Sequence, residues 1–283
     1  MSSKENDYKV SVIIPTLNRI NTLQRAIDSV IAQSFKSIEI IVVDNGSSDG
    51  SVKMLKKYYP TVKVIHEHKV GVSASRNKGI KYASSPWIAF LDSDDAWDQK
   101  KLEKQVNHLH NSHDKYRLIH TNEIWIRNGK KINQMKKHQK FGGYIFNECL
   151  SLCCVSPSSV LIDRSIFDDM GLFNENLPVC EDYDMWLRIC SKEEVLFLDE
   201  KLTLKYGGHK DQLSKSHWGM DRFRVSSIEN LILNYDLNKD QKNKSMVTLI
   251  KKLKIIINGA KKRNNSSVIN EYTKKLKYWE EFI

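Results

Sequence analysis

The chain has 283 residues and a net charge of +11, and 40% of its residues are hydrophobic. That length suits one large domain, or one domain with an appendage, and the apolar content can fill a core. We expect neither a membrane-spanning nor a secreted protein, because no apolar run approaches the eighteen or so residues of a span and the polar start has no secretory signal. The cysteines lack paired zinc-site spacing and are expected to be reduced thiols of a cytosolic protein: Cys149, Cys153, Cys154, Cys180 and Cys190.

The first third of the chain alternates apolar runs with helical patterns. Three short runs rich in β-branched residues are expected to be strands: residues 8–15, 38–43 and 62–66. Between the first two, apolar residues recur at helical spacing after Asn21, which we expect to cap the helix in a capping box with Gln24. A segment led by Gly71 is expected to enter another helix. Strands that alternate with helices indicate a parallel α/β sheet.

The fourth expected strand, the apolar run 87–91, leads directly into an acidic turn, Asp92-Ser93-Asp94-Asp95. An unbroken apolar run is typical of a central strand that is buried on both faces. Three adjacent carboxylates repel one another unless a cation holds them, and hard divalent cations prefer oxygen ligands. The alternative is a solvated acidic turn in which Asp95 or Asp98 caps the next helix.

Two other expected strands also end in polar residues. The first ends at Pro15 and Thr16, and the second at Asp44 and Asn45. The carboxyl ends of parallel strands lie along one edge, so we expect one crevice with hydrogen-bonding groups for a base and a ribose. Arg76, on the segment before the fourth strand, is a candidate phosphate ligand. No GxGxxG follows the first strand and no GxxxxGK[ST] occurs, which argues against a dinucleotide fold and a P-loop ATPase.

The rest of the chain alternates less regularly. Helices are expected at 99–110, 165–170, 181–190, 218–234, 240–262 and 267–282, and strands at 117–126, 159–163 and 195–206. The partial alternation of 117–126 suits an antiparallel or edge strand. From residue 237 onward twelve Lys and Arg residues face four Asp and Glu, so the excess charge is concentrated in the last helices. An anionic lipid surface, nucleic acid or a polyanionic acceptor would suit them, and a solubilising tail is the leading alternative.

Four segments, in this order and spacing, resemble family 2 inverting glycosyltransferases of the GT-A fold: SVIIPTLNR, VVDNGSSDGS, GVSASRNKGI and FLDSDDAW. The resemblance covers roughly residues 8–215. It implies an α/β GT-A domain over residues 1–215, with a Rossmann-like, mostly parallel sheet flanked by helices. The nucleotide-binding part would span about 8–97 and the acceptor part about 98–215. A basic helical C-terminal extension would follow over 216–283.

The resemblance also implies roles for single residues. Asp92-Ser93-Asp94 matches the DxD motif, so Asp94 is expected to bind Mg²⁺ or Mn²⁺ together with the donor diphosphate, and Asp92 to reach the ribose or the metal. Many members have Asp in place of Asn45, although an amide oxygen can still accept the N3–H that uracil shares with thymine. The nucleotide-binding set is expected to be Pro15, Thr16, Asn18, Arg19, Asp44, Asn45, Arg76, Asp92 and Ser93.

Glu181-Asp182 matches the ED motif of the family, in which the Asp is the general base. An acceptor hydroxyl must lose its proton as it attacks, and a carboxylate beside another in a closed site has its pKa raised. Acids at a helix start also suit the helix dipole, which is the simpler explanation of the pair when it is taken alone. His209, in YGGHKDQLS, resembles a histidine that reaches the metal or the diphosphate.

Together these features predict a metal-dependent inverting glycosyltransferase with Mn²⁺ or Mg²⁺ as cofactor. Its donor would be a nucleotide-diphosphate sugar, UDP or dTDP favoured, and its acceptor a hydroxyl of a glycan or lipid-linked sugar in cell-surface polysaccharide synthesis. We expect a cytoplasmic protein whose basic helices make peripheral contact with the inner face of the membrane, and no nucleic-acid partner. Two alternatives remain: a non-catalytic nucleotide-sugar-binding or scaffold protein, and a sugar nucleotidyltransferase. The latter would need a Gly-rich, basic loop where this chain has PTLNRIN.

Overall fold

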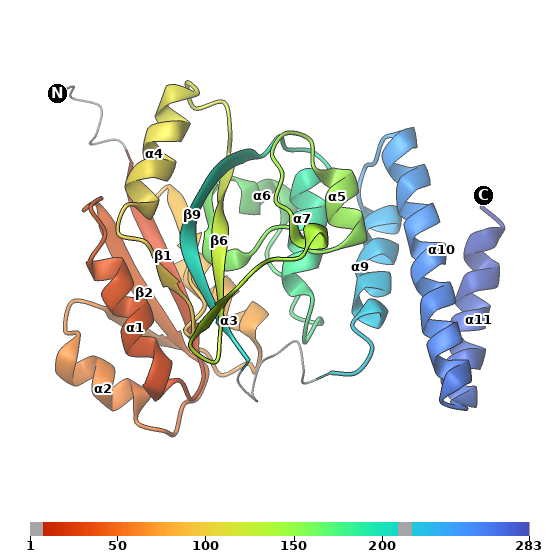
Figure 1. Ribbon diagram of the computed structural model, residues 1–283, viewed down its shortest axis with the longest axis horizontal. Coiled ribbons are helices and arrows are strands. Elements are labelled where there is room, and N and C mark those ends of the chain that lie inside the picture. The colour runs from red at the N-terminus through yellow and green to blue at the C-terminus, as the bar shows by residue number, and fades with distance from the viewer. Residues whose placement is uncertain (1–7, 209–216, 283) are drawn as a thin grey trace.

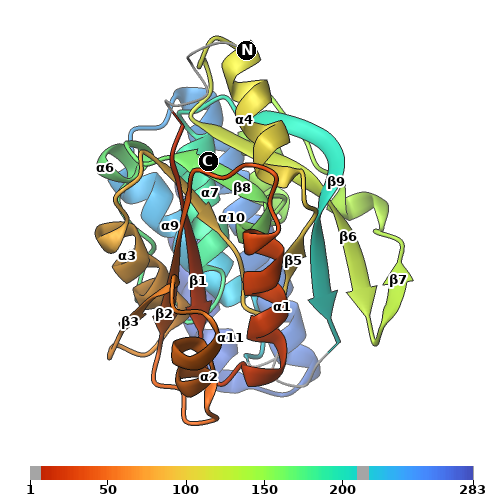
Figure 2. The same ribbon diagram turned by 90° about the vertical axis from the view of Figure 1, so that its left-hand side faces the viewer.

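A nine-stranded sheet with helices on both faces forms the centre of the molecule (Figures 1 and 2). The computed structural model describes residues 8–208 and 217–282. The strand order is β3-β2-β1-β4-β8-β6-β9-β5, and β7 pairs with β6 off this path. The expected α/β class, with a largely parallel sheet, flanking helices and C-terminal helices, is confirmed.

The first four strands are parallel, as predicted: β1 Val10–Thr16, β2 Ile38–Asp44, β3 Lys63–His66 and β4 Trp87–Phe90. Their register aligns the strand ends, since Thr16 pairs with Asp44 and Ile13 with Phe90. The second half is mixed: β5 Ala96–Trp97, β6 Leu118–Arg127, β7 Lys130–Ile132, β8 Val160–Asp163 and β9 Leu196–Gly207.

β6 confirms the antiparallel half of the expectation but is not an edge strand. It lies inside the sheet, antiparallel to β8 on one side and parallel to β9 on the other. Its polar positions are tolerated because a β-bulge shifts the register around Asn122 and turns side chains toward a cleft.

Helices cover both faces of the sheet: α1 Ile20–Ile31, α2 Ser51–Tyr58, α3 Val72–Tyr82, α4 Lys101–Asn111, α5 Phe146–Ser151, α6 Ile166–Met170, α7 Glu181–Cys190, α9 Asp221–Asn234, α10 Lys239–Lys262 and α11 Ser266–Glu280, with 3₁₀ turns η1 Lys136–His138 and η2 Pro157–Ser159. The central strands are mostly apolar because each face of the sheet has its own core. Val12 of β1 packs toward α1, and the next residue, Ile13, packs toward α3. Gly79 lets α3 approach closely, since a Cβ there would lie 2.4 Å from Ile13 Cγ2.

The C-terminal helices share a core with the rest of the chain. Figure 1 shows α9, α10 and α11 stacked beside α7 and α5, and buried side chains such as Leu249 and Leu253 belong to the same cluster as α7. The Lys252 ammonium is also buried, 3.2 Å from Asp221 Oδ1. Lys252 therefore does not belong to the basic surface of α10. No helix in the described part of the chain combines the length and the hydropathy needed to cross a membrane.

Two predicted helix caps are wrong. The first helix begins two residues earlier than expected, and Arg19 rather than Asn21 precedes it without a side-chain cap. Asp49 accepts a hydrogen bond from the Ile20 N–H at 2.8 Å, so a neighbouring loop replaces the local cap. Lys100 occupies the cap position of α4, while Asp98 accepts from the Lys100 N–H within a turn.

Glu39 on β2 joins three segments and gives a testable stability effect. Burial of its carboxylate raises its pKa, but hydrogen bonds from Lys63, Ser11 and Ser84 outweigh this and lower it to about 2. A lowered folded-state pKa stabilises the protein above the ordinary value of 4.5, and that stability is lost as the pH falls toward 2.

We therefore expect Glu39→Gln to lower the free energy of unfolding at pH 6 by about 1–2 kcal/mol, allowing for partial solvent screening, and to have much less effect at pH 3. Chemical denaturation at both pH values measures the difference. Glu271→Gln, at an exposed carboxylate of α11, is the control and should behave as wild type. An equal effect of Glu39→Gln at both pH values would contradict the assignment.

Candidate functional site

The ends of β1 and β2 form one side of a polar crevice. The Asn45 N–H donates to the Thr16 carbonyl at 2.9 Å, which continues the pairing of the two strands. Pro15 and Thr16 are buried, and Thr16 Oγ1 has no hydrogen-bond partner among the residues that the structure describes. An unpaired buried hydroxyl at the end of a strand is a group that a bound molecule could satisfy.

The loops after these strands are tied to each other. Asp44 is 2% exposed and accepts hydrogen bonds from the N–H groups of Gly46 and Ser47, each longer than 3 Å. Asn18, with a φ of +53°, accepts from the Ser48 N–H at 2.8 Å and donates its own N–H to Ser47 Oγ at 2.9 Å. The residues expected around the nucleobase are thus brought together.

The Asn45 side chain mainly holds the next loop. Its amide nitrogen donates to the carbonyls of Glu67 and Lys69 at 2.8 and 2.9 Å, and its oxygen accepts from the Gly71 N–H at 2.8 Å. Both amide donors are therefore used within the protein, and one lone pair of the oxygen remains for a further donor. The amide thus positions the start of α3, a role that the sequence motif did not indicate.

The three acids of the turn after β4 divide into two kinds. Asp95 is 2% exposed and accepts from Ser158 Oγ at 2.7 Å and from the Tyr206 N–H at 3.0 Å. Burial raises the pKa of Asp95, partly offset by the Lys205 ammonium. Asp92 and Asp94 are partly exposed, and Ser93 between them is buried. Asp95 is therefore structural, whereas the Asp92 and Asp94 side chains are partly exposed at the surface of the turn.

Arg76 joins this turn to the start of α7. Its guanidinium, 3% exposed, lies 2.8 Å from Asp92 Oδ1 through Nη2 and 2.6 Å from Glu181 Oε1 through Nη1. The two carboxylates raise the pKa of Arg76 against its burial. Arg76, the expected phosphate ligand, thus forms an ion-paired bridge between two carboxylates of the protein. Lys78, two residues later, is exposed.

Glu181 and Asp182 open α7 in different surroundings. Burial and the neighbouring Asp182 carboxylate raise the pKa of Glu181, while Arg76 opposes the shift. Asp182 is only partly buried, with Oδ1 accepting from the Tyr183 N–H at 2.7 Å and Oδ2 lying 3.4 Å from Cys153 Sγ. Glu181 is therefore fixed by the bridge, and Asp182 is the more accessible of the two acids.

Several residues of the site carry no signal in the sequence. Ser158 Oγ accepts from the Asp92 N–H and supports Asp95, and Lys205 Nζ donates to Ser156 Oγ at 2.9 Å. The Arg25 guanidinium stacks on the Tyr206 ring at 3.6 Å and donates to the Asp94 carbonyl. Each of these contacts joins residues distant in sequence, so no local pattern could have revealed it.

The carboxylates of Asp92 and Asp94 suit a divalent ion that takes its remaining ligands from a bound substrate. Within residues 8–208 and 217–282, no group of three or more His, Cys, Asp or Glu side chains could hold a metal by itself. Mg²⁺ is commonly bound by one or two carboxylates and completed by substrate phosphates, and Asp92 and Asp94 supply such a partial set of oxygens. His209, the third expected ligand, lies outside the described residues.

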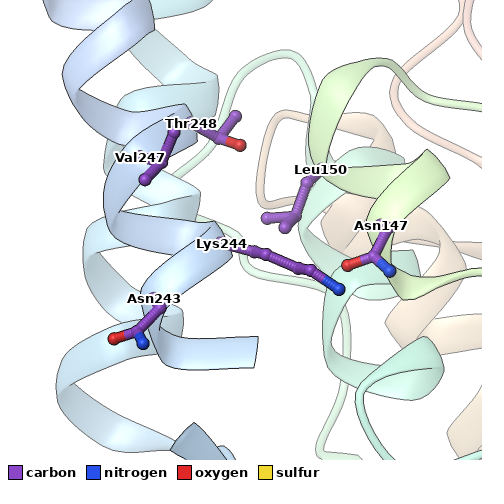
Figure 3. Close-up of a pocket in the computed structure, with 6 residues that line it drawn as sticks. All are labelled: Asn147, Leu150, Asn243, Lys244, Val247 and Thr248. Atoms are coloured by element: carbon purple, nitrogen blue, oxygen red, sulfur yellow. The ribbon is translucent and has the colours of Figure 1, made fainter. Parts of the chain in front are cut away.

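Two cavities are lined by residues other than these carboxylates. One, of about 370 Å³, lies between α5 and α10, where Lys244 extends toward Asn147 and Leu150 (Figure 3). It has no carboxylate among its described lining residues and does not suit metal-assisted chemistry. The other, of about 480 Å³, lies beside β6 and β7 and is strongly polar.

The sequence pattern that defines "Glycosyl transferase family 2" matches residues 11–171 of this chain. An uncharacterised glycosyltransferase of Rickettsia conorii is 34% identical over 200 residues, which are 70% of this chain and 33% of the relative. This chain thus spans about a third of the length of that relative. The Escherichia coli protein WfgD, named a UDP-Glc:α-D-GlcNAc-diphosphoundecaprenol β-1,3-glucosyltransferase, is 30% identical over 77% of this chain and 83% of its own length.

Solved structures show the same fold at low sequence identity. Staphylococcus aureus TarS 1–349 in complex with UDP-GlcNAc superposes with a TM-score of 0.69 at 21% identity, over 87% of this chain and 71% of TarS. The mannosyltransferase PcManGT from Pyrobaculum calidifontis, in complex with GDP-Man and Mn²⁺, gives a TM-score of 0.63 at 13% identity, over 96% and 84% of the two chains.

Arg76 and Arg117 give a matched test of the bridge, since each joins two carboxylates. Arg76 is 3% exposed, whereas the Arg117 side chain, paired with Asp169 and Glu193, is 28% exposed. Removing one side of a buried ion pair leaves unpaired charge and costs about 3–5 kcal/mol, while a surface pair contributes less than about 1 kcal/mol.

We expect Arg76→Gln to lower the free energy of unfolding by about 3–5 kcal/mol, and Arg117→Gln by less than about 1 kcal/mol. Denaturant titration at neutral pH measures both. Equal losses for the two variants would mean that the buried bridge does not hold the site together.

Proposed function

The chain belongs to glycosyl transferase family 2, and we propose that it transfers a sugar from a nucleotide-diphosphate donor to an acceptor hydroxyl with inversion. The observation that carries this proposal is the Arg76 bridge. It holds the turn with Asp92 and Asp94 against the residue that precedes Asp182. A pair of carboxylates suited to a diphosphate-bound metal and a carboxylate suited to proton abstraction therefore belong to one rigid unit.

The donor nucleotide would bind across the ends of β1 and β2. Thr16, Asn18 and Asp44 supply hydroxyl, amide and carboxylate groups there, and the remaining lone pair of the Asn45 oxygen suits the N3–H of uracil or thymine. A pyrimidine donor, UDP-sugar or dTDP-sugar, is accordingly favoured. The UDP-GlcNAc complex of TarS shows that this fold accommodates a UDP-sugar.

Asp94 and Asp92 would hold Mg²⁺ or Mn²⁺ against the donor diphosphate. When bound, such an ion acts as a Lewis acid and offsets the negative charge that develops on the leaving diphosphate. Arg76 would fix the orientation of Asp92 through its ion pair. His209 is proposed as a further ligand.

Asp182 would take the proton from the attacking acceptor hydroxyl. Its Oδ2 lies 3.4 Å from the Cys153 thiol, a weak donor that an acceptor hydroxyl can replace. The hydroxyl oxygen would attack the anomeric carbon from the face opposite the diphosphate, which inverts the configuration. Glu181 would keep Asp182 in place through its ion pair with Arg76.

We expect two carboxylate variants to separate binding from chemistry. Asp94→Ala should abolish the Mn²⁺-dependent thermal stabilisation by UDP, since a bound ligand raises stability by RT ln(1 + [L]/Kd). Asp182→Asn should keep that stabilisation but slow donor hydrolysis by about 10²-fold or more, because the base is lost. Asp98→Ala, at an exposed carboxylate after the same turn, is the matched control.

Thermal-shift assays with UDP, dTDP, GDP and CMP, and coupled detection of released nucleoside diphosphate, provide the measurements. Stabilisation by GDP alone would contradict the proposed base pocket. Donor hydrolysis at the same rate in wild type and in Asp182→Asn would contradict the catalytic role.

The acceptor would be a glycan or a lipid-linked sugar, as the name of WfgD indicates for that relative. The exposed lysines of α10 would then contact an anionic membrane surface at the cytoplasmic face, each adding about 1 kcal/mol. Replacing Lys251, Lys261 and Lys262 by Ala should weaken sedimentation with phosphatidylserine vesicles by about ten-fold or more. The same change at Lys53, Lys56 and Lys57 of α2 is the control, and equal binding by both triple variants would argue against this membrane contact.

A further inference from the structure

The polar cleft beside β6 is built around a bulge. The register between β6 and β9 shifts on either side of Asn122, whose oxygen accepts from the Glu123 N–H at 2.8 Å and whose nitrogen donates to Asp199 at 2.6 Å. A bulge re-aims the side chains next to it. Here Glu123 and Trp125 line a cavity of about 480 Å³ that is closed by β7 and the segment after it.

Glu123 is a buried carboxylate with spare hydrogen-bonding capacity. Its Oε2 accepts from Trp125 Nε1 at 2.8 Å. The Lys140 ammonium lies 3.3 Å from Oε1, yet no hydrogen bond reaches that oxygen among the described residues. The side chain is 1% exposed. Because a buried polar atom without a partner is costly, this oxygen is suited to accept a hydroxyl from a bound molecule.

The inner end of the cleft is connected to the candidate site through β9. Lys205 pairs with Trp125 across the β6–β9 register, and its ammonium donates to Ser156 Oγ at 2.9 Å. Ser158, two residues later, accepts from the Asp92 N–H and donates to Asp95. A molecule in the cleft would therefore extend toward the acidic turn after β4.

The lining suits a saccharide with a negative charge. Four amide side chains, which both donate and accept, match the dual character of sugar hydroxyls, and the Trp125 indole offers an apolar face. The amides are Asn122, Asn133, Gln134 and Gln139. Three exposed rim lysines have no ion pair within the described residues, whereas the acids of the lining are Glu123 and Asp199. The rim lysines are Lys131, Lys136 and Lys201.

We propose that this cleft binds the acceptor saccharide, with its inner end toward the acidic turn that carries Asp92 and a phosphate-bearing part of the acceptor at the lysine rim. The proposal rests on the glycosyltransferase function and adds a location and a charge preference for the second substrate. Glu123 accepts an acceptor hydroxyl, Trp125 packs against a sugar ring, and Lys131 and Lys136 select for the anion.

The test compares two double variants with the same change in charge. Lys131→Ala/Lys136→Ala removes two rim lysines, and Lys130→Ala/Lys137→Ala removes two exposed lysines next to them that do not line the cleft. The probes are N-acetylglucosamine 1-phosphate and neutral N-acetylglucosamine. Saturation-transfer NMR follows their binding in the presence of saturating UDP and Mg²⁺, which blocks the donor phosphate site.

Wild type and the Lys130→Ala/Lys137→Ala variant should bind the phosphorylated probe about five-fold or more tightly than the neutral one, and Lys131→Ala/Lys136→Ala should lose that preference. Thermal stabilisation by UDP should be the same in all three proteins. Its absence would refute the glycosyltransferase function, whereas unchanged stabilisation with an unchanged probe preference in the rim variant would refute the acceptor cleft alone.

A second measurement does not depend on charge. Trp125→Phe keeps an aromatic ring but removes one indole, so the fluorescence change that the phosphorylated probe causes in wild type should disappear in this variant. Persistence of the full fluorescence change would place the probe elsewhere and overturn the proposal.

Discussion

The arrangement of the site depends on one buried cation between two carboxylates. Asp92 follows a parallel strand, and Glu181 begins a helix about ninety residues later in the chain, so no local interaction places them together. Like charges would drive these acidic segments apart in a buried setting. Arg76 replaces this repulsion by two attractive contacts, of 2.8 Å to Asp92 and 2.6 Å to Glu181, which fix the position of both carboxylates. Removing Arg76 would leave the two carboxylates facing each other without a cation between them.

The parallel half of the fold was predictable because a strand that is buried on both faces is a nearly continuous apolar run, which can be recognised in the sequence of that strand by itself. Val12 and Ile13 pack into different cores, so both faces of β1 are buried and most of its residues are apolar. The short strands β5 and β7 and the 3₁₀ turn η2 lack such a signal, because their conformation is set by the strands and loops against which they lie. The wrong helix cap at Asn21 has the same origin, since Asp49 from another loop performs that task.

The residues of the candidate site were likewise predictable only in part. The motifs located Asp92, Asp94, Glu181 and Asp182, because chemistry restricts which residue types can perform those tasks. They did not reveal that Arg76 forms ion pairs with Asp92 and Glu181, or that Asn45 holds the loop before α3. Nor did they indicate the supporting contacts of Ser158 and Lys205. Such contacts join distant segments through common residue types, which no spacing distinguishes from ordinary surface positions.

The burial of Lys252 links the outermost helices to the chemistry. Its ammonium lies 3.3 Å from the Ser151 carbonyl at the end of α5 and 3.2 Å from Asp221 on α9. Two residues after Ser151 the chain reaches Cys153, which contacts Asp182. Only a few covalent and hydrogen-bonded links therefore separate the exposed side of α10 from the proposed base. The helix that carries the exposed lysines is therefore packed into the same structure as the proposed base, and is not a separate flexible tail.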